Sequence, residues 1–192
     1  IGLPGETLTM KNGTVYINGK ALAEPENMQR NYIIETDGTP ISEALLDELK
    51  ISNEARSLGA GQSPYGNELW YAMPLTKSAM KEIKAQPYVK KVRFLDVDES
   101  NPMDSLLTYP IGVKKSWTHN DYGPLWIPKK GATLNLTLQK LPYYIRCIKN
   151  YEGNEVDVKG GKIYINGKET KTYTFKMDYY WMMGDNRHNS AD

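Results

Sequence analysis

Cysteine is nearly absent from this chain of 192 residues, because Cys147 is its single cysteine. One cysteine excludes an internal disulfide. It leaves an extracytoplasmic location open, because a domain of this size can rely on its hydrophobic core. Phenylalanine is also scarce, with 2 residues against 14 tyrosines and 4 tryptophans. Tyrosine and tryptophan combine an apolar ring with a polar group, which suits half-buried sheet surfaces and binding clefts.

The chain also lacks a marked excess of charge, since 24 Lys and Arg residues nearly cancel 23 Asp and Glu residues. Without a long basic block, nucleic acid is not an expected partner. No apolar run is long enough to span a bilayer, and no signal-peptide pattern begins at Ile1. An isoleucine is not a native start, so we expect a membrane anchor upstream of this chain.

Two β-hairpins are predicted, one near each end of the chain. Residues 5–20 alternate apolar and polar positions around an Asn-Gly turn at 12–13, which is a strong hairpin signal. A similar pattern returns at 155–168, and the pentapeptide Tyr-Ile-Asn-Gly-Lys occurs in both copies. We favour two independent hairpins that solve the same turn problem; an internal duplication is the alternative.

A different pattern, of helices between strands, occupies residues 31–96. Ser42 is the predicted N-cap of one helix, and Thr76 caps a second that Pro87 ends. Three short strands flank these helices, and residues 53–67 are predicted to be a loop. The resulting order is β-α-β-α-β, typical of a small α+β unit.

The rest of the chain is expected to be β-sheet or irregular. Predicted strands cover 124–128 (an edge strand), 133–138, 143–148 and 173–177, and a buried strand covers 179–183. The predicted fold class is therefore mainly β with an inserted small α+β unit. We expect residues 1–22 and 123–192 to form the β region, 31–96 the inserted lobe, and 97–122 an irregular connection.

The two ends of the chain carry a resemblance to a known family. Residues 184–192 read Gly-Asp-Asn-Arg-His-Asn-Ser-Ala-Asp. This string resembles the Gly-Asp-Asn-Arg-x-x-Ser-x-Asp-Ser-Arg box of bacterial type I signal peptidases, and we call it the C-terminal box. Residues 1–6, Ile-Gly-Leu-Pro-Gly-Glu, resemble the segment that follows the catalytic lysine in the same family. The resemblance implies coiled antiparallel sheets, and it places the catalytic lysine and the nucleophilic serine upstream of Ile1.

The resemblance also implies supporting roles for four residues of the C-terminal box. A serine–lysine protease needs a neutral lysine as general base, which burial favours by lowering the lysine pKa. Ser190 would orient that lysine, and Asp185 would pair with the arginine after it. Asp192 would pair with an arginine just past the end of the chain, and Arg187 would brace the turn. The alternative is that these side chains only order a loop.

Metal or cofactor chemistry is not expected. His188 has no cysteine or second histidine at ligand spacing, and His119 is read as a residue of a surface loop. The resembling family uses no cofactor.

The predicted function is that of a type I signal peptidase fragment. Such enzymes cleave signal peptides from exported preproteins with a Ser/Lys dyad, at the outer, periplasmic face of the bacterial cytoplasmic membrane. With the dyad missing, we predict that this chain alone is inactive. The rival is a non-enzymatic, signal-peptidase-like binding module whose inserted lobe docks a partner protein.

Overall fold

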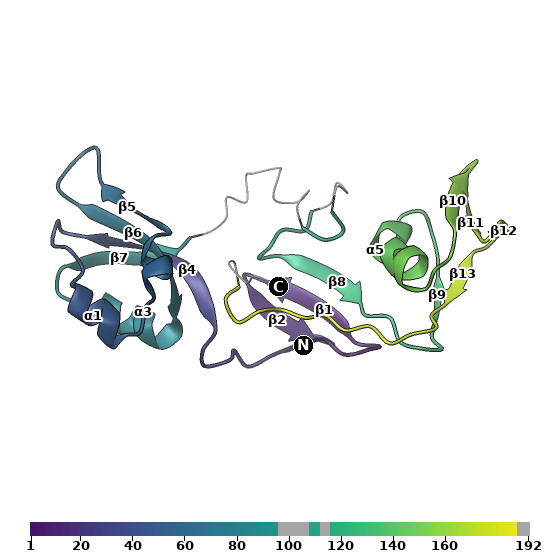
Figure 1. Ribbon diagram of the computed structural model, residues 1–192, viewed down its shortest axis with the longest axis horizontal. Coiled ribbons are helices and arrows are strands. Elements are labelled where there is room, and N and C mark those ends of the chain that lie inside the picture. The colour runs from purple at the N-terminus through teal and green to yellow at the C-terminus, as the bar shows by residue number, and fades with distance from the viewer. Residues whose placement is uncertain (96–107, 112–115, 188–192) are drawn as a thin grey trace. The chain divides into compact units, whose positions relative to one another are not determined.

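The computed structural model describes residues 1–95, 108–111 and 116–187 (Figure 1). The chain forms two compact units, which are described separately. Unit 1 comprises Ile1–Ala23 and Val97–Met182, and unit 2 comprises Glu24–Asp96 and Met183–Asp192. Much of the predicted irregular connection 97–122 lies outside the described residues. Both units are built on antiparallel sheets, which confirms the mainly β fold class.

Within the described residues, unit 1 holds three small sheets and one helical segment. The first sheet has the order β3-β2-β1-β8, the second β10-β11-β12, and the third pairs β13 with β9. Their bounds are β1 (Thr7–Lys11), β2 (Thr14–Ile17), β3 (Lys20–Ala21), β8 (Tyr122–Trp126), β9 (Thr133–Asn135), β10 (Val156–Lys159), β11 (Lys162–Ile165), β12 (Lys168–Glu169) and β13 (Thr172–Thr174).

The first predicted hairpin is confirmed. Strands β1 and β2 pair antiparallel, and Asn12 and Gly13 between them both have positive φ angles, of 48° and 72°. Two consecutive left-handed residues are the signature of a type I′ turn, which matches the twist of the flanking strands. The alternation buries Leu8 and Met10 of β1 against the core. Strand β8 covers the outer edge of β1 and is an edge strand, as predicted.

The second predicted hairpin is confirmed, and it repeats the first in detail. Leu8 pairs with Ile17 in one copy, as Val156 pairs with Ile165 in the other. The side chain of Asn18 accepts a hydrogen bond from the Thr7 N–H at 2.9 Å. Asn166 accepts the equivalent bond from the Glu155 N–H, also at 2.9 Å. The equivalence therefore extends beyond the shared pentapeptide to the pairing register of a whole three-stranded unit.

The predicted strand at 143–148 is wrong. The segment forms helix α5 (Leu141–Arg146), which continues as a π-helical turn η1 (Cys147–Tyr151). Its aromatic and β-branched residues favour a strand locally. The helix prevails because it buries Leu141, Tyr144 and Ile148 on one face, at helical spacing. Pro142 in the first turn supports the helix start, where its missing N–H is not needed.

The predicted buried strand at 179–183 is also wrong. Only Trp181 makes a β-bridge, and the neighbouring Tyr180 and Met182 are 60% and 64% exposed. The predicted strand at 133–138 is shortened, because β9 ends at Asn135. Propensity alone misassigned these segments because it does not specify a pairing partner.

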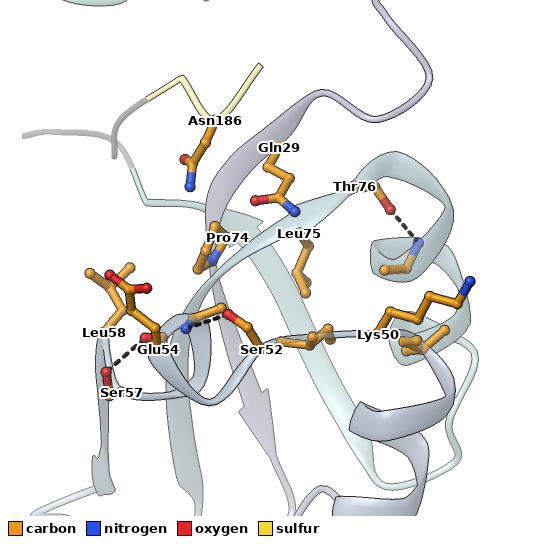
Figure 2. A pocket seen from close by; sticks show the side chains of 14 residues that line it. Gln29, Lys50, Ser52, Glu54, Ser57, Leu58, Pro74, Leu75, Thr76 and Asn186 are labelled. Atoms are coloured by element: carbon orange, nitrogen blue, oxygen red, sulfur yellow. Dashed lines mark hydrogen bonds between the residues drawn. The ribbon is translucent and has the colours of Figure 1, made fainter. Parts of the chain in front are cut away.

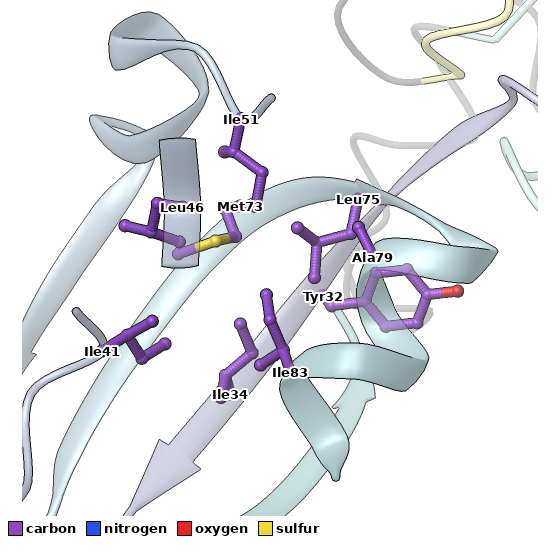
Figure 3. Close-up of a cluster of buried hydrophobic side chains, with 9 residues drawn as sticks. All are labelled: Tyr32, Ile34, Ile41, Leu46, Ile51, Met73, Leu75, Ala79 and Ile83. Atoms are coloured by element: carbon purple, nitrogen blue, oxygen red, sulfur yellow. The ribbon is translucent and has the colours of Figure 1, made fainter. Parts of the chain in front are cut away.

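Unit 2 is a four-stranded antiparallel sheet with helices against it. The strand order is β5-β6-β4-β7, with β4 and β6 in the centre. Figure 3 shows residues of α1 and α3 meeting residues of β4 and β6 in one apolar cluster. The bounds are β4 (Gln29–Thr36), α1 (Glu43–Glu48), α2 (Asn53–Arg56), β5 (Gly59–Gln62), β6 (Leu69–Thr76), α3 (Lys77–Lys84) and β7 (Val89–Phe94).

Both predicted helix caps are confirmed. The Ser42 hydroxyl accepts from the Leu45 N–H, and the Thr76 hydroxyl accepts from the Ala79 N–H, each at 3.2 Å. Each bond satisfies one of the backbone donors left unpaired in a first helical turn. Ile83 of α3 is fully buried in the core.

The predicted loop at 53–67 contains two elements that the sequence did not reveal. Helix α2 is capped by Ser52 and is held by Arg56, which pairs with carboxylates on α1. Strand β5 has the sequence Gly-Ala-Gly-Gln and no apolar alternation. Its glycines let it lie against a tryptophan: a Cβ on Gly61 would lie 2.8 Å from Nε1 of Trp70. Glycine is therefore a packing requirement there and not a loop signal.

Candidate functional site

The N-terminal motif of unit 1 forms a tight turn. Glu6 donates its N–H to the Leu3 carbonyl at 3.1 Å, and Gly5 has a φ of 87°. Proline at the second position and a left-handed glycine at the third define a type II turn. The Glu6 carboxylate closes it further by accepting from the Leu3 N–H at 2.7 Å. Leu-Pro-Gly-Glu is thus a structural unit whose residue types are set by the turn.

Gly2 joins the N-terminal motif to the segment that precedes the C-terminal box. Gly2 and Trp181 exchange two backbone hydrogen bonds, at 2.8 Å and 3.0 Å. A Cβ at Gly2 would lie 2.4 Å from Ile127 Cδ1 and 3.2 Å from Trp181 Cβ, so both side chains would have to move. The glycine of the motif therefore suits this close pairing.

The described part of the C-terminal box lies in unit 2, against the start of β4. Gln29 donates its N–H to the Asp185 carbonyl at 2.8 Å, and Arg187 donates its N–H to the Gln29 carbonyl at 3.2 Å. Gln29 and Asn186 form a parallel bridge. The sequence predicts that the box belongs to the β region 123–192; the described residues 183–187 belong to unit 2. Sequence reasoning missed Gln29, because it contributes through its backbone, which carries no side-chain signal.

Arg187 is half-buried near two other charged side chains, Arg30 and Glu24. Burial lowers the pKa of its guanidinium, and so does the nearby charge of Arg30, while Glu24 acts in the opposite direction. Arg30 itself forms an ion pair with Glu24 at 2.5 Å. One guanidinium nitrogen of Arg187 also contacts the sulfur of Met183 at 3.7 Å. The side chain of Arg187 therefore packs within the turn, and no ion pair of it is found among the described residues.

The other predicted site residues are only partly placed. Asp185 is exposed, and its carboxylate accepts from the Asn186 N–H at 3.0 Å, which fixes the turn. Ser190 and Asp192 lie outside the described residues, as does His188. The structure therefore brings Asp185 and Arg187 together with Gln29, and the roles of all four box residues stay predictions.

A pocket of about 490 Å³ lies in unit 2 next to the box turn (Figure 2). Its floor is apolar, formed by Leu75 and Ala79 with residues of the α1–α2 connection. Its rim is polar, with side chains that include Lys50 and Glu54. Gln29 and Asn186, which share the parallel bridge, both line it. The full lining comprises Gln29, Leu49, Lys50, Ile51, Ser52, Glu54, Ala55, Ser57, Leu58, Pro74, Leu75, Thr76, Ala79 and Asn186.

Unit 1 has an aromatic-walled pocket of about 230 Å³, beside α5 and Trp181. Several of its tyrosine hydroxyls have partners within the unit: Tyr109 donates to the Tyr143 carbonyl at 2.7 Å, and Tyr144 donates to the Trp126 carbonyl at 3.2 Å. The pocket also borders Cys147, and burial raises the pKa of its thiol to about 11. A thiol that stays protonated is a poor nucleophile. The Cys147 thiol is therefore not a nucleophile at neutral pH.

Two further properties concern metals and membranes. Within residues 1–95, 108–111 and 116–187, no group of three or more His, Cys, Asp or Glu side chains is placed to hold a metal ion. None of the helices in the described part of the chain has the length and apolar character needed to cross a membrane.

Comparison with known proteins identifies the class to which these motifs point. The family model described as signal peptidase, peptidase S26, matches residues 1–63. A curated relative, Signal peptidase I of Bacillus amyloliquefaciens, is 72% identical over 25 residues, which cover 13% of this chain and 13% of that protein. No solved structure matches the chain. The two matches confirm the resemblance of the N-terminal part of this chain to signal peptidases.

Proposed function

We propose that this chain is the supporting part of a type I signal peptidase that removes signal peptides from exported preproteins. The nucleophilic serine and the general-base lysine of the Ser/Lys dyad belong to the sequence upstream of Ile1. The reaction takes place at the outer face of the bacterial cytoplasmic membrane, where an upstream anchor holds the enzyme. The exported preprotein is the substrate, and no cofactor takes part.

The observation that carries the proposal is the backbone pairing of Gly2 with Trp181. In the proposed enzyme the lysine lies a few residues before Ile1, and the Ser190 hydroxyl must reach it at about 3 Å. The segment that carries the lysine and the segment that carries Ser190 must therefore lie close together. Gly2 follows the lysine segment, and Trp181 precedes the C-terminal box. The two hydrogen bonds between Gly2 and Trp181 hold these two stretches side by side. This convergence supports the proposal because nothing in the local sequence of either segment requires it.

Four residues of the box have distinct roles in this proposal. Ser190 directs the neutral lysine toward the nucleophile. Asp185 and Asp192 each pair with an arginine outside this chain. Arg187 braces the turn, in keeping with its half-buried guanidinium.

The decisive experiment uses the intact parent protein, that is, this chain together with the upstream sequence that carries the proposed serine and lysine. The substrate is a preprotein with an Ala-x-Ala cleavage site. We expect cleavage after the small residue, and we expect Ser190→Ala to lower kcat by about 100-fold, the lower end of acid–base contributions. Thermal unfolding should be unchanged, because the hydroxyl acts in the chemical step. Ser63→Ala, a change in a turn of the lobe, is the matched control and should leave kcat unchanged.

Two outcomes would contradict the proposal. A parent that contains both upstream motifs but cleaves nothing would favour the rival, a binding module. Specific cleavage by the present chain alone would show that the upstream dyad is not needed. The same assay with the present chain is therefore run in parallel, and we expect no cleavage.

A further inference from the structure

The pocket of unit 2 has the position and the lining of a binding site for a polypeptide substrate. It adjoins the C-terminal box directly, because Asn186 of the box is one of its walls. Ser190 follows Asn186 by four residues, so chain connectivity limits their Cα separation to about 14 Å. A substrate cleaved beside the lysine that Ser190 orients can thus reach the pocket with a few additional extended residues.

The lining of the pocket indicates which part of a preprotein would enter it. A signal peptide is dominated by an uninterrupted apolar run. The pocket combines an apolar floor, with Leu75 and Ala79, and a rim that carries one positive and one negative side chain, Lys50 and Glu54. Such a lining suits an ordinary soluble segment that inserts one apolar side chain and keeps its polar neighbours at the rim.

The side of the pocket next to the C-terminal box can also form hydrogen bonds with a peptide backbone, through the side chain of Gln29. Figure 2 shows the Gln29 side chain between the box turn and Thr76. A side-chain amide both donates and accepts hydrogen bonds, as a peptide group does. The backbone of Gln29 is fixed by its two bonds to Asp185 and Arg187, so its side chain starts from a defined position.

We infer that this pocket binds the mature part of the preprotein, on the carboxyl side of the cleavage site. The inference rests on the proposed function and deepens it. The inserted lobe then contributes to substrate specificity. It binds residues of the preprotein that take no part in the reaction, and this contact adds binding energy. Binding energy of this kind raises kcat/KM for long substrates without changing the chemistry at the cleaved bond.

The test compares two substrates in the intact parent enzyme. One is a full preprotein, and the other is a short peptide that ends just after the cleavage site. Ser57→Trp places a large ring at the exposed rim of the pocket, and Lys84→Trp places the same ring on the exposed face of α3, outside the pocket lining. We expect Ser57→Trp to lower kcat/KM for the preprotein about tenfold, a typical loss from a blocked side-chain contact. The short peptide should be cleaved at the unaltered rate by both variants.

Each other outcome overturns the inference. Equal losses on both substrates would mean that Ser57→Trp disturbs the box and not a remote contact. Unaltered cleavage of both substrates would mean that the pocket is not used. A parent that cleaves neither substrate would reject the proposed function itself, which separates that failure from a failure of the pocket. Thermal unfolding of both variants confirms that the lobe remains folded.

Discussion

The Glu152 carboxylate accepts four hydrogen bonds, and its removal tests how unit 1 is held together. One oxygen accepts from the Tyr173 hydroxyl at 2.5 Å. The other accepts from the Lys176 N–H at 2.9 Å, the Met177 N–H at 3.2 Å and the Tyr179 hydroxyl at 3.1 Å. The carboxylate therefore ties the end of η1 to the segment that leads toward Trp181.

The size of the effect follows from these four bonds. A hydrogen bond to a charged group contributes roughly 1.5–3 kcal/mol, and bonds that share an acceptor do not add. Lys176 and Met177 are exposed, so water can replace Glu152 at their N–H groups. The Tyr173 side chain is buried, and Asn154 already donates to its hydroxyl at 2.8 Å, so the lost acceptor is not replaced easily. We expect Glu152→Ala to destabilise unit 1 by about 2–4 kcal/mol.

The assay is urea unfolding followed by tryptophan fluorescence. Trp70 is the tryptophan of unit 2, so a Trp70→Phe background restricts the signal to unit 1. Glu152→Gln keeps the size of the side chain and one acceptor oxygen. It should therefore lower the free energy of unfolding of unit 1 about half as much as Glu152→Ala does. Surface substitutions usually change the free energy of unfolding by less than about 0.5 kcal/mol. If the urea midpoint of Glu152→Ala corresponds to a loss that small, this account is refuted.

Two further predictions concern one side chain in each unit. Ile83→Ala should destabilise unit 2 by about 2–5 kcal/mol, because it leaves a cavity among fully buried neighbours. The Trp70 signal, taken as the difference between unfolding curves with and without Trp70→Phe, measures this, and the exposed change Lys81→Ala is its control. Cys147 keeps its proton in the folded state up to a pKa of about 11, whereas an unfolded thiol ionises near its ordinary value of 9.0. The unfolded state therefore loses its proton first as the pH rises, so the contribution of Cys147 to stability falls between about pH 9 and 11. Cys147→Ser should remove this part of the pH dependence, and an identical alkaline profile would contradict the assignment.

The parts of the fold that could be predicted from sequence are those set by short-range chemistry. Asn12-Gly13 specifies a type I′ turn because both residues accept positive φ angles. Ser42 and Thr76 mark helix starts because their hydroxyls satisfy a backbone N–H three residues ahead. These signals act over two to four residues, so they survive in any tertiary setting.

The parts that could not be predicted depend on partners distant in sequence. The segment that became α5 and η1 has strand propensity, and the core that buries Ile148 decides its structure. Strand β5 pairs with β6 where Gly61 lies close against Trp70, a contact that no local pattern indicates. The site shows the same limit: Asp185 and Arg187 were found from their motif, whereas Gln29 was not, because its contribution is a pair of backbone bonds.

Because these two backbone bonds join the box to β4, the position of the box should depend on the lobe. Substitutions of Gln29 alone can test this. Gln29→Pro removes the N–H that Asp185 accepts at 2.8 Å, while Gln29→Ala keeps it. A short peptide substrate does not reach the pocket, so trimming the side chain should not matter, and Gln29→Ala should keep the full kcat in the intact parent. Gln29→Pro should lower kcat about tenfold. Without the bond to Gln29 the box shifts slightly, and a small displacement of a residue that positions the reacting groups is enough to reduce the rate by this factor. Thermal unfolding shows whether the lobe stays folded in the proline variant. If a folded Gln29→Pro enzyme cleaves the short peptide as fast as Gln29→Ala, the first strand of the lobe does not position the box, and the lobe acts through its pocket alone.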